Sequence, residues 1–526
     1  MSDPPVAVVE THLSVLFFVG DRVYKLHKPV RFAFADFSDR SARQADSRRE
    51  VTLNRRLAPD VYLGVVDVSE HGEPVDHLVV MRRLPADRQL AALARGGADV
   101  AVCLAQVART LVGFHARATR AAAIDETARA ASVLAGWEAN FTEMAPFVGP
   151  VIDAGAEALV QHQVRRFLAG RTALFDERIA HGHVCDGHGD LQAEDVFCLA
   201  DGPRILDCIT FDDRLRYGDV AADLAFLLMD LERIGAADAA ATVRAEYEEL
   251  SGQVLPASLL DHYIAARAYV RSKVACLRWA QQGSPRGRSS QRTGELAPPR
   301  AVADEARHLH RIARDHLQRS QVRLVLVGGL PGTGKSTLAS ALAERIDADV
   351  LCSDEIRKEQ AGIPADQPAP APYGSQLYAP EITESTYRIL RQRAQVALGL
   401  GRTVVLDASW KDRRQREAAQ RVAAATSSDL VELRCTVDDA VAAARIAARR
   451  RLGGDPSDAT AAVAMAMAAE ADRWPSASVV DTTGEPEASL HQALQYVVDG
   501  RCRRHEPPPP ARSSPGQRAG RAPLAR

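Results

Sequence analysis

The chain has 526 residues, which exceeds one ordinary domain core and predicts two or three domains. Hydrophobic residues make up 46% and charged residues 25%, as in globular proteins, and a formal net charge of −2 excludes a histone-like or polybasic protein. No uncharged apolar run reaches about 18 residues and no basic-then-apolar segment opens the chain. We therefore expect no transmembrane helix, no secretory signal and a cytoplasmic location.

The N-terminal part begins with short runs in which apolar and polar side chains alternate, and this period of two is typical of strands. The predicted strands and the helix between them occupy 11–30 (two strands with a turn at Gly20-Asp21), 40–57 (the helix), 61–68 and 75–84. From about residue 88 the chain is rich in Ala and Leu at helical spacing. A mostly helical body should therefore follow the strands.

A stretch rich in Gly, Pro, Ser and Arg, 283–300, predicts an exposed linker, and 301–320 predicts an amphipathic connecting helix. Beyond them strands and helices alternate to about residue 500, which indicates a parallel α/β sheet. The predicted strands of this sheet are 323–328, 349–352, 403–406, 430–434 and 478–481. The expected divisions of the chain are 1–282, 283–320, 321–500 and a disordered basic tail at 501–526.

The most specific motif lies in the second domain, where an apolar strand precedes Gly329-x4-Gly334-Lys335-Ser336 and a helix follows. In this setting glycines turn backbone N–H groups towards phosphate oxygens, and the helix start adds its positive dipole. Lys335 is expected to hold the β- and γ-phosphates and Ser336 to ligate Mg²⁺. Only six of the 66 basic residues are lysines, so a lysine here is informative. The predicted ATP-binding residues of this loop are Gly329, Leu330, Pro331, Gly332, Thr333, Gly334, Lys335, Ser336 and Thr337.

Charged residues follow two other predicted strands of the same sheet. Ligands of open α/β sheets bind outside the carboxyl ends of the strands, so Asp354 is predicted to accept the proton of an acceptor hydroxyl. Arg357, one helical turn later, is predicted to pair with charge on the acceptor. Asp407 is predicted to hold Mg²⁺ together with Ser336. The alternatives are that Asp354 caps a helix and that Asp407 is an ordinary strand-end residue.

An arginine-rich helix near the end of this domain places Arg445 and Arg449 on one face. These two residues are predicted to bind ATP by closing a lid on the transferring phosphoryl group. The alternative is a solvated helix whose basic end complements the helix dipole.

Through GGLPGTGKST, SDEIR, VVLDAS and the arginine-rich segment, residues 320–500 resemble P-loop kinases of the zeta toxin, chloramphenicol phosphotransferase and polynucleotide kinase group. This resemblance implies that Asp354 is the base that activates the acceptor hydroxyl. The Pro-rich stretch 361–378 stands where an acceptor-binding loop would follow.

A second set of carboxylates, in the N-terminal half, has kinase-like spacing. Asp190 closes a His-Gly-Asp sequence in a predicted loop, Asp195 follows five residues later, and Asp207 ends the next strand. Protein-kinase-type enzymes use this spacing for the Asp that orients the acceptor hydroxyl, an oxygen ligand and a metal-binding Asp. Lys25 on a predicted strand and Glu50 on a predicted helix occur in the order that allows a phosphate-holding Lys–Glu pair.

These motifs resemble the aminoglycoside phosphotransferase and choline kinase family over about residues 10–280. The resemblance implies roles for five residues, namely Asp190 as catalytic base, Asp207 as Mg²⁺ ligand, Lys25 as nucleotide lysine, and Asp219 and Asp223 as braces of the catalytic loop. The two domains together are similar to bacterial bifunctional phosphotransferase/ATP-binding proteins.

Two residues depart from the pattern of that family, because Asp195 replaces an Asn and Gln192 replaces a usual His. No Gly-rich loop precedes Lys25, and Lys28 is its rival, although strand alternation puts the two on opposite faces. Three close carboxylates repel one another. The alternative for this domain is therefore a kinase-like fold that no longer transfers phosphate.

The eight cysteines are scattered singly, and in a cytosolic-looking chain we expect reduced thiols. His181, His183, Cys185 and His188 crowd together without a second ligand pair, so we predict no zinc there.

The predicted fold class is mixed α/β and α+β, with a two-lobed protein-kinase-like domain joined to a P-loop parallel α/β kinase domain. The predicted function is transfer of the ATP γ-phosphoryl to a hydroxyl of a small molecule or nucleotide, with ATP and Mg²⁺ as cofactors. The alternatives are an ATP-binding regulatory module and, with less support, an AAA-type remodelling ATPase. We expect no membrane partner, and a nucleic acid acceptor is open but not favoured; the acceptor and the oligomeric state are not predicted.

Overall fold

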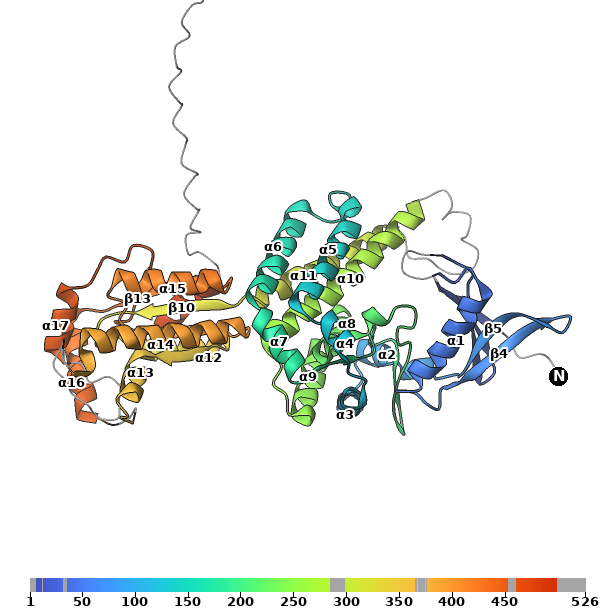
Figure 1. Cartoon of the computed structure of the whole chain (residues 1–526), viewed down its shortest axis with the longest axis horizontal. Coiled ribbons are helices and arrows are strands. Elements are labelled where there is room, and N and C mark those ends of the chain that lie inside the picture. Colours follow the sequence, from blue (N-terminus) through green and yellow to red (C-terminus); the bar gives the residue numbers. More distant parts are fainter. Residues whose placement is uncertain are drawn as a thin grey trace, which may run out of the picture.

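The computed structural model describes residues 6–11, 13–31, 36–283, 299–364, 367, 374, 376–452 and 460–498. Figure 1 shows two bodies along the long axis of the molecule, with the N-terminal half on the right and the C-terminal half on the left. The predicted linker is mostly outside the described residues, and so is the predicted tail. Within the described ranges, no helix combines the length and apolar character needed to cross a bilayer.

The smaller lobe of the N-terminal body is an antiparallel sheet of five strands with one helix packed on it. The strands follow the order β1-β2-β3-β5-β4. Their bounds are β1 (Ala7–Glu10), β2 (Ser14–Val19), β3 (Arg22–His27), β4 (Tyr62–Glu70) and β5 (Glu73–Arg82). Helix α1 (Arg40–Asn54) starts at Asp39, whose carboxylate accepts from the amides of Ser41 and Ala42. Val51 of α1 packs on Val23 and Val79 of the sheet.

The larger lobe is mainly helical and surrounds α8 (Val220–Arg233), in which every residue from Val220 to Leu231 is buried. The other helices are α2 (Leu90–Arg95), α3 (Ala101–Arg117), α4 (Ala122–Thr127), α5 (Ala130–Met144), α6 (Ala154–Gly170), α7 (Thr172–Ala180), α9 (Ala237–Ser251) and α10 (Ala257–Gly283). Two small antiparallel sheets pair β6 (Val184–Asp186) with β9 (Tyr217–Asp219) and β7 (Val196–Leu199) with β8 (Gly202–Ile205). A sheet lobe joined to a helical lobe is the predicted protein-kinase-like arrangement.

The predicted amphipathic helix at 301–320 is confirmed as α11 (Pro299–Arg319). Its apolar residues Ala306, Leu309 and Ala313 belong to the core of the helical lobe. At its end, the His316 ring lies 2.6 Å from Asp261 and 2.8 Å from Glu232. This helix is thus packed on the N-terminal body before the chain enters the second domain.

The C-terminal body is a parallel sheet in the order β11-β12-β10-β13-β14, covered by helices on both faces. Its strands, β10 (Arg323–Gly328), β11 (Asp349–Cys352), β12 (Val404–Asp407), β13 (Asp429–Thr436) and β14 (Ser478–Asp481), match the predicted ones closely. Its helices are α12 (Lys335–Ile346), α13 (Ser353–Gln360), α14 (Pro380–Gly399), α15 (Arg413–Ala425), α16 (Asp439–Leu452), α17 (Ala461–Ala469) and α18 (Pro486–Val498). Leu324 and Leu326 of β10 enter one apolar cluster, whereas Val325 and Val327 enter another, so both faces are buried.

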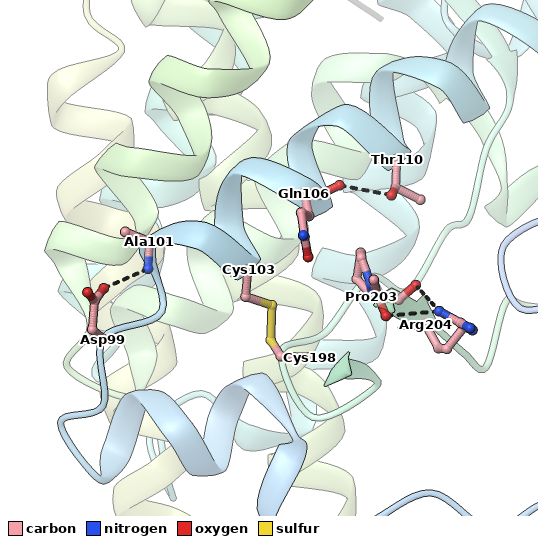
Figure 2. The surroundings of a disulfide bond; sticks show 9 residues. Asp99, Ala101, Cys103, Gln106, Thr110, Cys198, Pro203 and Arg204 are labelled. Carbon is pink, nitrogen blue, oxygen red and sulfur yellow. Dashed lines mark hydrogen bonds between the residues drawn. A yellow bond between two sulfur atoms is a disulfide. The ribbon is translucent and has the colours of Figure 1, made fainter. Parts of the chain in front are cut away.

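The expectation of reduced thiols is wrong for one pair, because Cys103 and Cys198 form a disulfide. Figure 2 shows this bond joining α3 to the β7–β8 hairpin. The Cα atoms lie 5.7 Å apart although the residues are 95 positions apart in sequence. Such a pairing follows from packing, which single cysteines at irregular spacing cannot reveal. Five other described cysteines are free, and Cys502 lies outside the described residues.

The two bodies meet at the amino ends of the parallel strands. The Arg171 guanidinium, at the start of α7, donates to the Thr426 carbonyl at 2.6 Å and to the Ser428 hydroxyl at 3.2 Å, just before β13. The Ser258 hydroxyl of α10 donates to the Gly401 carbonyl at 2.7 Å, just before β12. The carboxyl ends of these strands therefore point away from the N-terminal body, as Figure 1 shows.

Substituting Gly401→Ala tests this joint. Gly401 has φ +80°, and an added Cβ would lie 2.5 Å from Ser258 Oγ. An alanine forced into left-handed backbone and the loss of the Ser258–Gly401 hydrogen bond should together lower the free energy of unfolding by about 2–4 kcal/mol. The matched control is Gly484→Ala, because nothing lies within 4 Å of its added Cβ. Equal denaturation midpoints for the two variants would contradict the described joint.

Candidate functional site

The phosphate-loop motif occupies the turn between β10 and α12. Gly332 and Gly334 have φ of +84° and +77°, which L-residues with side chains rarely adopt. A Cβ at Gly329 would lie 2.5 Å from Thr333 Oγ1, and one at Gly332 would lie 2.6 Å from the Ala442 carbonyl. The motif therefore requires glycine both for its backbone conformation and for the close approach of α16.

Neighbouring segments fasten this loop. The Thr333 hydroxyl donates to the Leu330 carbonyl at 2.8 Å, and the Thr482 hydroxyl donates to the Thr333 carbonyl at 2.6 Å. Arg445 of α16 donates to the Thr482 carbonyl at 2.8 Å, and one of its guanidinium nitrogens is 3.5 Å from the position of a Cβ added to Gly334. Arg445 thus reaches the loop; the side chain of Arg449 is outside the described residues.

Asp407, at the carboxyl end of β12, lies beside the loop because β12 is hydrogen-bonded to β10. The side chain is 3% exposed. Burial raises the pKa of Asp407, although the charge of Lys335 and a hydrogen bond with Ser336 oppose the rise. Asp407 Oδ1 is buried and accepts no hydrogen bond from the described residues. The predicted residues Lys335, Ser336 and Asp407 therefore lie together, and Asp407 Oδ1 is left to bind a further ligand.

Asp354 and Arg357 lie one strand further out, after β11. Their side chains form an ion pair on the first turns of α13, and the guanidinium stacks 4.8 Å from the centre of the Tyr378 ring. The helix is capped at Cys352, so the alternative in which Asp354 is only an N-cap is wrong. Half of the predicted acceptor loop at 361–378 is outside the described residues.

In the N-terminal body, Lys25 lies between the lobes and bridges two acids. Its Nζ donates to Glu50 Oε1 at 2.9 Å and to Asp207 Oδ1 at 3.0 Å. Burial alone would raise the pKa of Glu50, but the ammonium of Lys25, with a contribution from His27, lowers it to about 2. Lys28 instead pairs with Glu10 on the edge strand at 2.5 Å. The structure thus places Lys25, and not Lys28, beside Glu50 and Asp207.

The remaining carboxylates face one another close to Asp207, which has φ +64°, a strained value for a residue with a side chain. Burial raises the pKa of Asp190 to about 6, with Arg271 opposing the rise and Asp207 adding to it. Burial beside Asp207 and Asp190 raises the pKa of Asp195 well above its usual range. The repulsion expected for Asp195 is therefore present.

Asp223 holds the loop before Asp190. Its carboxylate accepts from the amides of His188 at 2.6 Å and Gly189 at 2.9 Å, and lies 3.3 Å from the His115 ring. Burial alone would raise the pKa of Asp223, but these partners hold it well below its usual range. Asp219 does not reach this loop, because it caps α8 and pairs with Arg178 at 2.7 Å.

Comparisons with known proteins found a family model that matches part of the C-terminal body and relatives that match nearly the whole chain. The family model described as "AAA domain" matches residues 324–474. The uncharacterized proteins Rv2004c of Mycobacterium tuberculosis and Mb2027c of Mycobacterium bovis are each 40% identical over 495 residues, covering 93% of this chain and 95% of theirs. The chain belongs to the family of these mycobacterial proteins.

Two solved structures of kinases are more distant. A gluconokinase from Sinorhizobium meliloti 1021 has 17% identity and a TM-score of 0.26, covering 34% of this chain and 94% of its own. A choline/ethanolamine kinase family protein from Mesorhizobium loti has 13% identity and a TM-score of 0.36, covering 59% and 92%. The kinase-like, two-domain character of the chain rests on its own strand order and phosphate loop.

Sequence reasoning missed several residues at these sites. Arg267 and Arg271 of α10 both contribute positive charge at Asp190, and Tyr62 accepts from the amide of Asp207 at 3.2 Å. The four-residue spacing of the two arginines on a helix was a usable signal, because it puts both on one face. Nothing local to Tyr62 indicated that its hydroxyl would reach the Asp207 backbone.

The brace at Asp223 can be tested by hydrogen exchange. In Asp223→Asn the amide group cannot accept both backbone bonds, so exchange at His188 and Gly189 should quicken by about tenfold or more. Asp219→Asn is the matched control, since its carboxylate serves Arg178 and the start of α8 instead. Equal exchange at both amides in the two variants would show that Asp223 is not the brace.

Proposed function

We propose that the chain is an ATP-dependent phosphotransferase whose P-loop domain transfers the γ-phosphoryl of ATP to an acceptor hydroxyl. The observation that carries this proposal is the meeting of Asp407, Lys335 and Ser336 at one sheet end, with Asp354 one strand away. A site for nucleotide binding alone needs the loop and its metal residues, but not a second carboxylate on the acceptor side.

Each residue has a distinct part in the proposed reaction. The loop amides and Lys335 hold the phosphates, and Arg445, already at the loop, adds positive charge over them. Asp354 accepts the proton of the acceptor hydroxyl as that oxygen attacks the γ-phosphorus, and the bond to the ADP oxygen breaks. Arg357 holds Asp354 in place and offers charge to an anionic acceptor.

The residues present fit a magnesium ion. Oxygen ligands are what Mg²⁺ prefers, and the unpartnered Asp407 Oδ1 lies in the same cluster as the Ser336 hydroxyl. Asp407 and Ser336 would hold the ion, which would neutralise phosphate charge when bound.

For the N-terminal body we propose a second kinase-like site, with Lys25 and Glu50 for the nucleotide, Asp207 and Asp195 for metal, and Asp190 as base. The Lys25–Glu50 contact of 2.9 Å supports this assignment. The raised pKa of Asp195 favours the alternative, an ATP-binding regulatory protein in which this body is a degenerate kinase-like domain, because a protonated acid is a poorer metal ligand.

Measuring ATP turnover across acceptor candidates tests the P-loop assignment. Asp354→Asn should keep ATP binding but lose about 10²–10⁴-fold in phosphoryl transfer, because the proton acceptor is removed. Lys335→Ala should weaken both binding and turnover. Glu355→Gln is the matched control, since it removes an exposed acid from the same helix. If Asp354→Asn and Glu355→Gln turn over ATP at the same rate, the phosphotransferase proposal is contradicted and the domain is a nucleotide sensor.

The N-terminal assignment predicts a pH profile for the turnover that survives Lys335→Ala. A base with a pKa of about 6 is active when deprotonated, so turnover should rise through about pH 6 and then level. Arg271 favours the carboxylate form, so Arg271→Gln should move the midpoint to higher pH, whereas Arg278→Gln on the same helix should not. If the turnover of Lys335→Ala is the same at every pH between 5 and 7, Asp190 is not the base. If Lys335→Ala has no turnover, the regulatory role is favoured.

A further inference from the structure

A buried histidine and two buried carboxylates meet behind the Lys25–Glu50 pair. His27 Nε2 of β3 lies 3.2 Å from Glu50 Oε2 and 3.5 Å from Asp46 Oδ2, both on α1. The exposed fractions of His27, Asp46 and Glu50 are 4%, 7% and 1%. Among the described residues this is the one group of three His, Cys, Asp or Glu side chains whose ligand atoms converge within 4.8 Å.

Within the described part of the chain, no hydrogen bond is formed by the three facing atoms. His27 Nε2, Asp46 Oδ2 and Glu50 Oε2 are all buried, and the ring nitrogen lies at ion-pair distance from both oxygens. Buried polar atoms in native proteins are almost always satisfied by protein, water or an ion. Three such atoms around one point therefore indicate a missing central partner.

The surroundings fit a cation at that point. Among the described residues, Lys25 Nζ forms ion pairs with Glu50 and Asp207 and none with Asp46. The other ring nitrogen of His27, Nδ1, lies 3.4 Å from the Ser14 hydroxyl, a partner of the kind that orients metal-binding histidines.

We propose that His27, Asp46 and Glu50 form a binding site for a divalent transition-metal cation of the zinc class. One imidazole nitrogen with two carboxylate oxygens is a donor set that Zn²⁺ and Mn²⁺ accept, whereas Mg²⁺ prefers oxygen alone. Zn²⁺ bonds of about 2.0–2.1 Å in tetrahedral geometry place ligand atoms about 3.3 Å apart, close to the two separations from His27 Nε2.

The site would tie β3 to α1. Glu50 then uses Oε1 for Lys25 and Oε2 for the cation, so binding would hold helix α1 in the position that forms the Lys25–Glu50 pair. The inference does not rest on the proposed function, because it concerns metal binding and the order of α1 rather than phosphoryl transfer.

Zinc titration of the full-length, chelator-treated chain in excess Mg²⁺ tests the site. The wild type should bind one more equivalent of Zn²⁺ than His27→Gln or Asp46→Asn, whose affinity should fall by about 100-fold or more. His77→Gln is the matched control, because His77 on β5 is similarly buried and its ring pairs with Asp67 at 2.8 Å. Equal Zn²⁺ stoichiometry in the wild type and in both site variants overturns the proposal.

A second readout uses the wild type alone, in case the variants do not fold. Zn²⁺ should slow amide exchange in α1 and β3 by about tenfold or more and leave α15 unchanged, whereas unchanged exchange in α1 overturns the proposal.

Discussion

A buried guanidinium fixes the relation between the two bodies. Arg171 is 1% exposed, and burial lowers its pKa to about 10, with the charge of Arg166 adding to the effect. Its contacts with the Thr426 carbonyl and the Ser428 hydroxyl compensate for lost hydration. Pulling the bodies apart breaks these bonds at a cost of about 3 kcal/mol or more. Because this joint contacts the amino ends of the parallel strands, the phosphate loop lies at the opposite, carboxyl end of the sheet.

Much of the C-terminal domain could be predicted because its signals are local. The five strands are apolar runs bounded by turns, and each appears within a few residues of its expected bounds. Strand alternation also separated Lys25 from Lys28, and the structure puts only Lys25 beside Glu50. The catalytic and binding roles of these residues stay predictions.

What the sequence could not predict depends on contacts between distant segments. The disulfide joins cysteines that share no spacing rule, and the joint at Arg171 meets a loop more than 250 positions later. The edge strand β1 is exposed along its length and carries no burial pattern. The cluster of His27, Asp46 and Glu50 was easier to predict from the sequence, because His27 is two residues from Lys25 and Asp46 is four from Glu50. Same-face reasoning on each element puts all four side chains together.

The disulfide also changes the covalent topology of the chain. It closes a ring from Cys103 to Cys198, and the ring contains Asp190 and Asp195. A protease cut at a single bond inside that ring leaves the two fragments attached to each other, and only a reductant releases them. The redox state of the surrounding medium therefore decides whether the segment that carries Asp190 and Asp195 is covalently closed into a ring or is part of a linear chain.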